Sequence, residues 1–131
     1  MRILIAEDDS TSARYMSGLL ARFGECVVVE DGELALAAYK AALEEGKPFQ
    51  LICLDIMMPR KNGQEVLEDI RQLERAADMK PGQGVKIIMT TALGDVRSVM
   101  SAYKGGATAY ITKPILTERL YETICSLGFE V

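Results

Sequence analysis

The 131-residue sequence contains no histidine, three cysteines and no long apolar run. Without histidine there is no imidazole zinc ligand, no Ser-His or Cys-His nucleophile pair and no imidazole acid–base catalyst. The cysteines, Cys26, Cys53 and Cys125, include no Cys-x-x-Cys pair and lie in apolar stretches, so we predict buried free thiols. No apolar run approaches the roughly 20 residues of a membrane span, and the run at 3–6 is too short for a signal peptide. We therefore expect a cytoplasmic protein.

The composition is typical of a soluble globular protein, with 49% hydrophobic and 26% charged residues. A chain of this length most simply forms one domain with its own core. The net charge is −4, and no cluster of Lys and Arg is dense enough for a nucleic-acid surface. Binding of DNA or RNA by this chain is therefore not expected.

Five short apolar or β-branched runs alternate with five amphipathic segments. The runs predict strands at residues 2–6, 26–30, 51–55, 85–90 and 108–112. The segments predict helices that begin near residues 10, 33, 64, 95 and 117. This alternation with short connections predicts an α/β fold, a doubly wound parallel sheet with helices on both faces.

Three local expectations concern the helices. Ser10, Thr11 and Ser12 offer hydroxyl groups that could cap the first helix. The charged residues of the third helix are most simply solvent-exposed. Residues 72–84 are expected to form a lengthened third helix and a polar loop of unknown function.

The third expected strand carries the most informative residue of the chain. Four apolar residues run directly into Asp55, and three more lead to Pro59. A short unbroken apolar run is typical of a parallel strand that is buried on both faces. Asp55 then falls at the carboxyl end of the strand, where open α/β sheets bind ligands. Its carboxylate is either functional or a cap.

Polar residues follow the other strands at the same edge. They are the acidic run at 7–9, Thr90–Thr91 and Lys113. Because the carboxyl ends of parallel strands meet at one edge, these side chains should converge with Asp55. An all-oxygen acidic site suits Mg²⁺ or Mn²⁺ and could hold a phosphoryl group. No Gly-x-x-x-x-Gly-Lys or Gly-x-Gly-x-x-Gly motif is present, so no nucleotide-binding loop is predicted.

Together these residues resemble the response regulator receiver domain of two-component signalling, the CheY-like family, over essentially the whole chain. The resemblance rests on the acidic pair Glu7-Asp8, the stretch 54–59 with Asn62-Gly63, Thr91-Ala92, Gly106-Ala107, Tyr110 and Lys113-Pro114. It implies a single domain over residues 1–131 with a flavodoxin-like five-stranded sheet of order 2-1-3-4-5 and five helices. The start at Met1 favours a stand-alone regulator over a domain of a longer protein.

The resemblance implies that Asp55 is the phosphoacceptor. Asp8, Asp55 and the backbone carbonyl of Met57 would bind Mg²⁺ directly, and Glu7 would bind it through a water molecule. Asp9 would occupy the following, more variable position.

Four further positions would serve the phosphoryl group or the response to it. Lys113 and the hydroxyl of Thr91 would bind phosphoryl oxygens, and the Ala92 backbone N–H would also reach them. Tyr110 would be the rotating aromatic residue of the family. Each residue has an ordinary structural alternative: a strand-end hydroxyl for Thr91, a rim lysine for Lys113 and simple packing for Tyr110. The family also implies a cis bond at Lys113-Pro114.

The implied function is that of a switch rather than an enzyme. The chain would accept a phosphoryl group from the phosphohistidine of a sensor histidine kinase or phosphotransfer protein. A downstream protein would bind the face formed by the fourth helix, fifth strand and fifth helix, and dimerisation on phosphorylation stays open. Met57 and Leu93, which flank the phosphoryl site, are apolar and cannot orient an attacking water. We therefore expect a long-lived acyl phosphate.

Two other functions would need residues that this chain lacks. A haloacid-dehalogenase-like phosphatase also forms an aspartyl phosphate, but it needs Asp-x-Asp, and Met57 stands at the second position. A flavodoxin-like small-molecule binder would need a phosphate-binding loop after the first strand, where this chain is acidic.

Overall fold

The computed structural model describes residues 1–80, 82–92 and 105–129. Their helices and strands are β1 (Arg2–Ala6), α1 (Ser10–Leu20), β2 (Glu25–Val29), α2 (Gly32–Glu44), β3 (Leu51–Asp55), α3 (Gly63–Ala76), β4 (Lys86–Thr91), β5 (Ala109–Thr112) and α5 (Thr117–Ser126). The five predicted strands are confirmed to within about two residues. The predicted fourth helix and Leu93 fall on residues 93–104, outside the described ranges. No helix within those ranges is long and apolar enough to cross a membrane.

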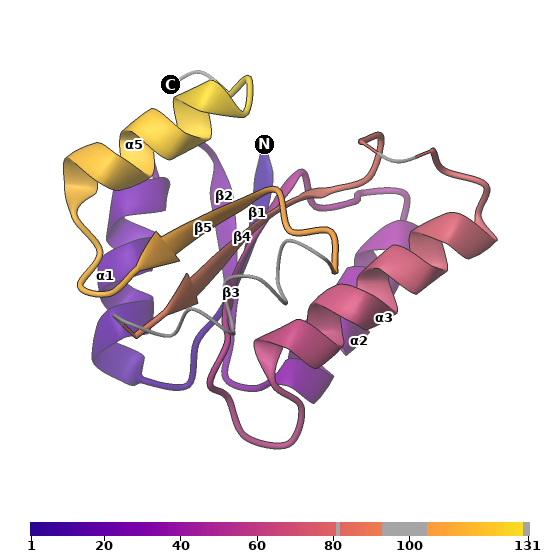
Figure 1. Cartoon of the computed structure of the whole chain (residues 1–131), viewed down its shortest axis with the longest axis horizontal. Coiled ribbons are helices and arrows are strands. Elements are labelled where there is room, and N and C mark those ends of the chain that lie inside the picture. Colours follow the sequence, from indigo (N-terminus) through magenta and orange to yellow (C-terminus); the bar gives the residue numbers. More distant parts are fainter. Residues whose placement is uncertain (81, 93–104, 130–131) are drawn as a thin grey trace.

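The five strands form one parallel sheet in the order β2-β1-β3-β4-β5 (Figure 1). This order confirms the flavodoxin-like topology. In register, Ala6 lies beside Leu54, and Asp55 lies beside Thr90. The carboxyl ends of β1, β3, β4 and β5 therefore meet at one edge of the sheet.

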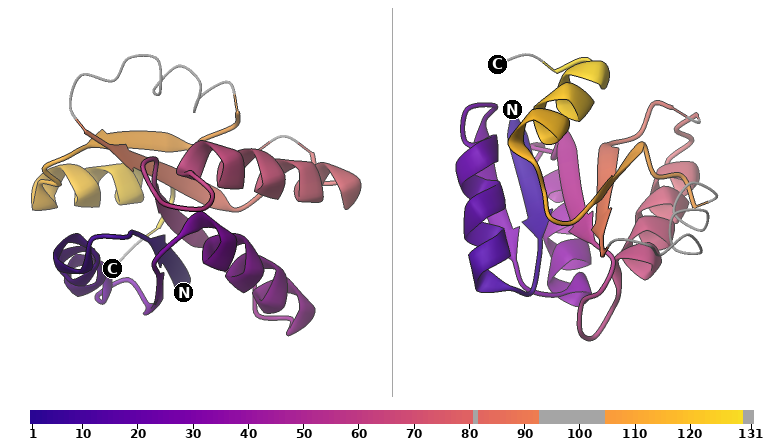
Figure 2. Two further views of the ribbon diagram at one scale, coloured as in Figure 1. Left: turned by 90° about the horizontal axis from the view of Figure 1, so that it is seen from below. Right: turned by 60° about the vertical axis from the view of Figure 1, so that its left-hand side comes forward.

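Helices cover both faces of the sheet (Figure 2). The helices α2 and α3 cover one face, and α1 and α5 cover the other. Alternate strand residues supply the two cores: Leu4, Ile52 and Ile87 face α2 and α3, whereas Ile3 and Ile88 face α1 and α5. Each fully buried Leu or Ile side chain contributes roughly 1.5–3 kcal/mol, so this sheet is a rigid support for residues at its edge.

Helix capping differs from the expectation at α1. The N-cap is Asp9, whose side chain accepts a hydrogen bond from the Ser12 backbone N–H at 3.1 Å and from the Ser12 hydroxyl at 2.7 Å. The prediction of a hydroxyl cap from residues 10–12 is therefore wrong, because the carboxylate directly before the helix occupies that position. At α3, Asn62 and Glu65 form a capping box.

The charged residues of α3 are not all solvent-exposed, contrary to the prediction. Glu74 is buried and pairs with Arg71 at 2.7 Å. Arg71 also donates to the carbonyl oxygens of Val85 and Gly106, at 2.8 and 2.9 Å. This ion pair lies at the amino edge of the sheet and joins α3 to the segments that lead into β4 and β5. The third helix ends at Ala76, and a loop follows it, of which residue 81 lies outside the described ranges.

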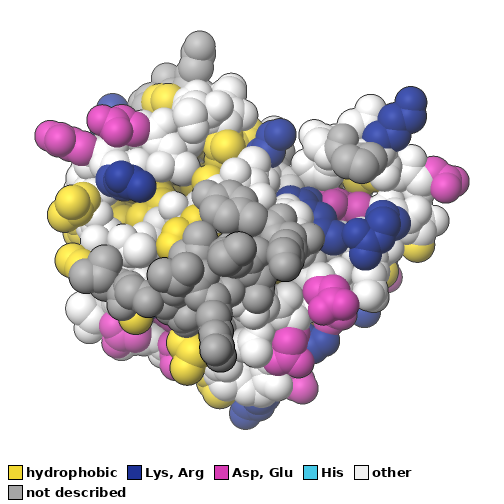
Figure 3. Space-filling view, in the orientation of Figure 1, with side chains coloured by type: hydrophobic (Ala, Val, Ile, Leu, Met, Phe, Trp, Pro, Cys, Tyr) yellow, Lys and Arg dark blue, Asp and Glu magenta, His cyan; other side chains and the backbone are white. Residues whose placement is uncertain are grey.

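The burial of the cysteines also differs from the expectation. Cys53 is buried, but Cys26 is half-buried and Cys125 is exposed, so the prediction of three buried thiols is wrong for Cys125. Met58 belongs to the core, whereas Met57 is 70% exposed. On the face drawn in Figure 3, Lys and Arg side chains are interspersed with Asp and Glu side chains over α3.

Candidate functional site

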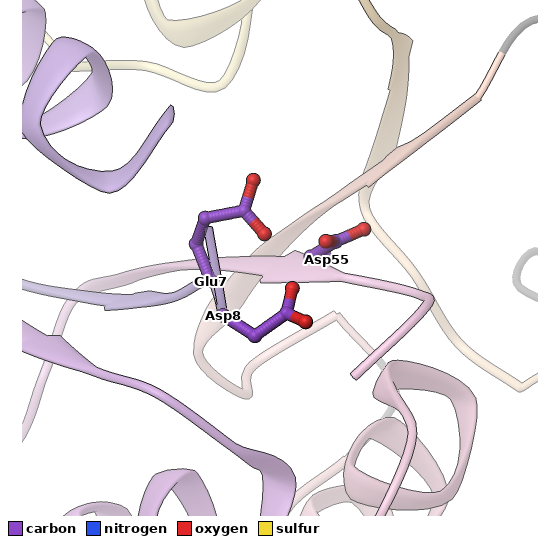
Figure 4. Close-up of side chains that lie close together, drawn as sticks. All are labelled: Glu7, Asp8 and Asp55. Carbon is purple, nitrogen blue, oxygen red and sulfur yellow. The ribbon is translucent and has the colours of Figure 1, made fainter. Parts of the chain in front are cut away.

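Three carboxylates meet at the carboxyl edge of the sheet (Figure 4). Glu7 and Asp8 follow β1, and Asp55 ends β3; one oxygen atom from each lies within 4.8 Å of the others. The Glu7 backbone N–H donates to the Val29 carbonyl at 3.0 Å, which fixes the chain after β1. The convergence expected from the parallel topology is therefore present. Asp9, which caps α1, is not part of this group.

Lys113 lies against two of these carboxylates. Its Nζ donates to Glu7 Oε1 at 2.5 Å and to Asp55 Oδ2 at 3.2 Å. Burial by itself would lower the pKa of Lys113, but the Glu7 and Asp55 carboxylates outweigh it and raise that pKa. The ammonium group therefore stays charged. The Lys113–Pro114 bond is cis, as the resemblance implies.

Glu7 shows that negative charge is in excess here. Burial, and next the hydrogen-bonded carboxyl group of Asp55, raise the pKa of Glu7 to about 7, although Lys113 lowers it. Its Oε2 atom is buried and has no hydrogen-bond partner among the described residues. A buried oxygen without a partner is costly, and a cation between the carboxylates would relieve both the repulsion and the missing contact. The residues present therefore fit a divalent cation held by oxygen ligands.

The hydroxyl and backbone groups of β4 lie at the same edge. Thr91 ends β4 and is buried, and its carbonyl accepts a hydrogen bond from the Lys113 backbone N–H at 2.6 Å. Ala92 follows and is exposed. The Thr90 hydroxyl donates to the Leu54 carbonyl at 3.4 Å. Tyr110, in β5, is half-buried and packs against the core under α2 and α3.

The loop after β3 closes directly over Asp55. The Met57 backbone N–H donates to Asp55 Oδ1 at 3.3 Å, and the Gly63 N–H donates to the Ile56 carbonyl at 2.9 Å. A Cβ atom on Gly63 would lie 2.3 Å from the Asp55 carbonyl oxygen, so only glycine allows this approach. The loop thereby keeps the Met57 backbone beside the carboxylates.

An apolar cavity of about 450 Å³ adjoins the site, and sequence reasoning did not anticipate it. Lys113 and Ala92 line it at the carboxyl edge, and Cys53, Met16 and Ile115 line it within the core between the sheet and α1. The small side chains of Ala6 and Cys53 help to leave this space open, because bulkier residues at these buried positions would occupy more of it.

Known proteins share this fold and this sequence pattern. The sequence model of the response regulator receiver domain matches residues 3–125. The chain is 33% identical to the chemotaxis protein CheY of Bacillus subtilis over 125 residues, which are 94% of this chain and 93% of CheY. It is 32% identical to the probable transcriptional regulatory protein SilR of Salmonella typhimurium over 127 residues, 97% of this chain but only 50% of SilR. The chain thus spans about half the length of that regulator.

A solved structure agrees at the level of the fold. A chain from the CheX–CheY–BeF₃–Mg²⁺ complex of Borrelia burgdorferi superimposes with a TM-score of 0.82 at 23% identity. The match covers 99% of the present chain and 90% of that chain.

Proposed function

The chain belongs to the response regulator receiver domain family of two-component signalling, and on that premise we propose that Asp55 accepts a phosphoryl group from a phosphohistidine. The donor is a sensor histidine kinase or a phosphotransfer protein, since this chain has no histidine. We further propose that residues 1–131 form one receiver domain in the cytoplasm. It acts as a switch, whose only chemistry is its own phosphorylation and dephosphorylation.

One observation carries this proposal: three carboxylates lie within 4.8 Å of one another, with the Lys113 ammonium 3.2 Å from Asp55. Asp55 ends a strand buried on both faces, so its position is fixed by the core rather than by a mobile loop. Fixed charges of this kind stabilise a transferring phosphoryl group without reorganisation during the reaction.

The acidic group is the proposed site for Mg²⁺, with Mn²⁺ as a substitute. Asp8, Asp55 and the Met57 backbone carbonyl would hold the ion directly, and Glu7 would hold it through water. When bound, the ion neutralises negative charge on the carboxylates and on the phosphoryl oxygens. Support comes from the buried Glu7 Oε2, for which residues 1–80, 82–92 and 105–129 offer no partner. The complex of Borrelia burgdorferi in which a chain shares this fold contains Mg²⁺.

The side chains have distinct roles in the transfer. A carboxylate oxygen of Asp55 forms the new P–O bond as the P–N bond to the donor imidazole breaks. Lys113 binds one phosphoryl oxygen as a point charge, and the Ala92 backbone N–H and the Thr91 hydroxyl bind others. The acyl phosphate carries roughly −1.5 to −2 charges by analogy with other phosphoryl groups, and this charge draws the Thr91 hydroxyl inward.

Thr91 and Tyr110 would pass this change to a partner. Tyr110 would turn inward when Thr91 moves, which alters the face formed by the predicted fourth helix, β5 and α5. The downstream protein would bind that face. Phosphorylation would leave the chain a monomer or bring two copies together as a dimer.

The two alternative functions find no support. The haloacid-dehalogenase-like phosphatase needs a second aspartate where Met57 stands, and the flavodoxin-like binder needs a phosphate loop where Glu7 and Asp8 stand. The family match covers residues 3–125 and favours neither.

The proposal is tested with Mg²⁺ and acetyl phosphate, a small phosphodonor. Intact mass spectrometry should show one added phosphoryl group, and peptide analysis should place it on Asp55. The Asp55→Asn variant should show no mass gain. A mass gain that persists in this variant would show that Asp55 is the wrong residue. Continuous turnover of the donor without a stable mass gain would favour a phosphatase instead.

A further inference from the structure

The loop between β3 and α3 is held at a second place, away from Asp55. Arg60, at the middle of this loop, extends to the turn between β2 and α2. Its Nη1 atom lies 2.7 Å from Asp31 Oδ2. Arg60 has a backbone φ of +66°, a left-handed conformation that non-glycine residues rarely adopt. The loop therefore has a defined shape at this point.

The position of the Asp31 side chain is also fixed by α2, independently of Arg60. Its side chain is 3% exposed, and its Oδ1 atom accepts the Leu34 backbone N–H at 2.8 Å as the N-cap of α2. This backbone hydrogen bond lowers the pKa of Asp31, and Arg60 lowers it further. One carboxylate oxygen of Asp31 thus caps α2, and the other binds the Arg60 side chain of the loop.

The backbones of the two segments also touch. A Cβ atom on Gly32 would lie 1.8 Å from the Lys61 carbonyl oxygen. Only glycine lets the turn approach the loop so closely. The ion pair between Arg60 and Asp31 and this backbone contact act on adjacent residues of the same loop.

We propose that the Arg60–Asp31 ion pair positions the loop that carries the Met57 carbonyl and thereby strengthens Mg²⁺ binding. The inference rests on the proposed function, because it takes the Met57 carbonyl as a metal ligand. Arg60 and Asp31 are positioning residues: they would act on the cation through the backbone of residues 57–60. Mutation of an outer group that orients a metal ligand commonly weakens metal binding about tenfold or more.

The sign of the effect separates positioning from simple electrostatics. Arg60 is a cation near a cation site, so its removal should strengthen Mg²⁺ binding if only its charge matters. If Arg60 positions the loop, its removal weakens binding. Lys61 provides the matched control, since it is a cation on the same loop and its partner, Asp69, lies on α3 rather than on the β2–α2 turn.

The test measures the Mg²⁺ dissociation constant by calorimetry for four variants. Arg60→Asn removes the ion pair and keeps a residue that tolerates positive φ. Asp31→Asn keeps an oxygen for the α2 cap. Each should weaken Mg²⁺ binding about tenfold, and the double variant should be no weaker than either alone. Lys61→Ala should leave binding unchanged or slightly tighter.

A second readout excludes a general loss of structure. Thermal unfolding in EDTA should show all four variants folded at the temperature of the calorimetry. In phosphorylation by acetyl phosphate, the Mg²⁺ concentration for half-maximal rate should rise in Arg60→Asn, with the rate at saturating Mg²⁺ unchanged. Wild-type affinity in Arg60→Asn, or tighter binding, would overturn the positioning role and leave the proposed function intact. A wild-type protein that binds no Mg²⁺ would overturn both.

Discussion

The two edges of the sheet both bury carboxylates against a cation, and they differ in how completely these groups are bonded. At the amino edge, Glu74 Oε1 pairs with Arg71 and Oε2 accepts the Val85 backbone N–H at 2.7 Å. At the carboxyl edge, three carboxylates converge and Lys113 contacts two of them, while Glu7 Oε2 has no partner within the part of the chain that the structure describes.

The difference in bonding suits the two edges to different roles. A buried ion pair with all its hydrogen bonds made is self-contained and holds segments together. A group of carboxylates with too little positive charge is unfavourable alone, and its energy improves when a cation arrives. The amino edge therefore fits a stabilising role, and the carboxyl edge fits the proposed cation site.

The largest effect is expected when the amino-edge pair is broken. Arg71→Ala leaves the buried Glu74 carboxylate without its cation and should lower the free energy of unfolding by about 3–5 kcal/mol. Chemical denaturation measures this change. Lys61→Ala, which breaks a more exposed pair, is the control and should change stability little. A loss below about 1 kcal/mol in Arg71→Ala would contradict the stabilising role.

The carboxyl edge should instead affect how the unfolding free energy of the metal-free protein depends on pH. Because the pKa of Glu7 is raised from 4.5 to about 7, the folded state holds a proton that the unfolded state releases. The free energy of unfolding should therefore fall as pH rises between these values, by up to about 3 kcal/mol from this residue. Glu7→Gln should lack that part of the slope. The same dependence of unfolding free energy on pH in the wild type and in Glu7→Gln would contradict this prediction.

Mg²⁺ should stabilise the protein through the carboxyl edge alone. At ten times its dissociation constant, a ligand that binds only the folded state adds about 1.4 kcal/mol. Differential scanning fluorimetry should show this gain in the wild type, its reversal by EDTA and its loss in Asp8→Asn. The amino-edge variant Arg71→Ala, where it remains folded, should respond to Mg²⁺ like the wild type. A wild type that does not respond would speak against the cation site.

The smallest predicted effect concerns the lifetime of the acyl phosphate. Met57 is 70% exposed and apolar, and Leu93 lies outside the described residues. Met57→Asn together with Leu93→Glu introduces groups that can orient water, and dephosphorylation should become about fivefold faster, about 1 kcal/mol in the barrier. Met57→Leu is the control. If the phosphorylated double variant decays at the wild-type rate, apolar side chains at positions 57 and 93 do not slow hydrolysis of the acyl phosphate.

The contrast between the edges also explains which features were predictable from the sequence. The carboxyl edge could be predicted because apolar strands end directly at Glu7 and Asp55, and parallel topology brings strand ends together. The Arg71–Glu74 pair could not be predicted, since its other partners, Val85 and Gly106, lie 11–35 residues away. A helical pattern alone gives no sign of such contacts.

The other features could not be predicted because they depend on backbone geometry and packing. Four residues in a row, 9–12, can cap α1, and only the backbone geometry selects Asp9. Cys125 lies in an amphipathic helix, where its face depends on packing rather than on its apolar neighbours. The Arg60–Asp31 pair joins two loops, whose shapes the sequence pattern does not specify.

One measurement compares the edges most directly: the unfolding free energy of Asp55→Asn and Glu74→Gln in metal-free buffer at pH 7. Each change replaces a buried carboxylate by an amide of the same shape. We expect Asp55→Asn to raise the stability, because it removes a negative charge from a group of converging carboxyl groups. We expect Glu74→Gln to lower it by about 3 kcal/mol, because Arg71 loses its charged partner. A loss of stability in both variants would contradict the distinction between a ligand-binding edge and a stabilising edge.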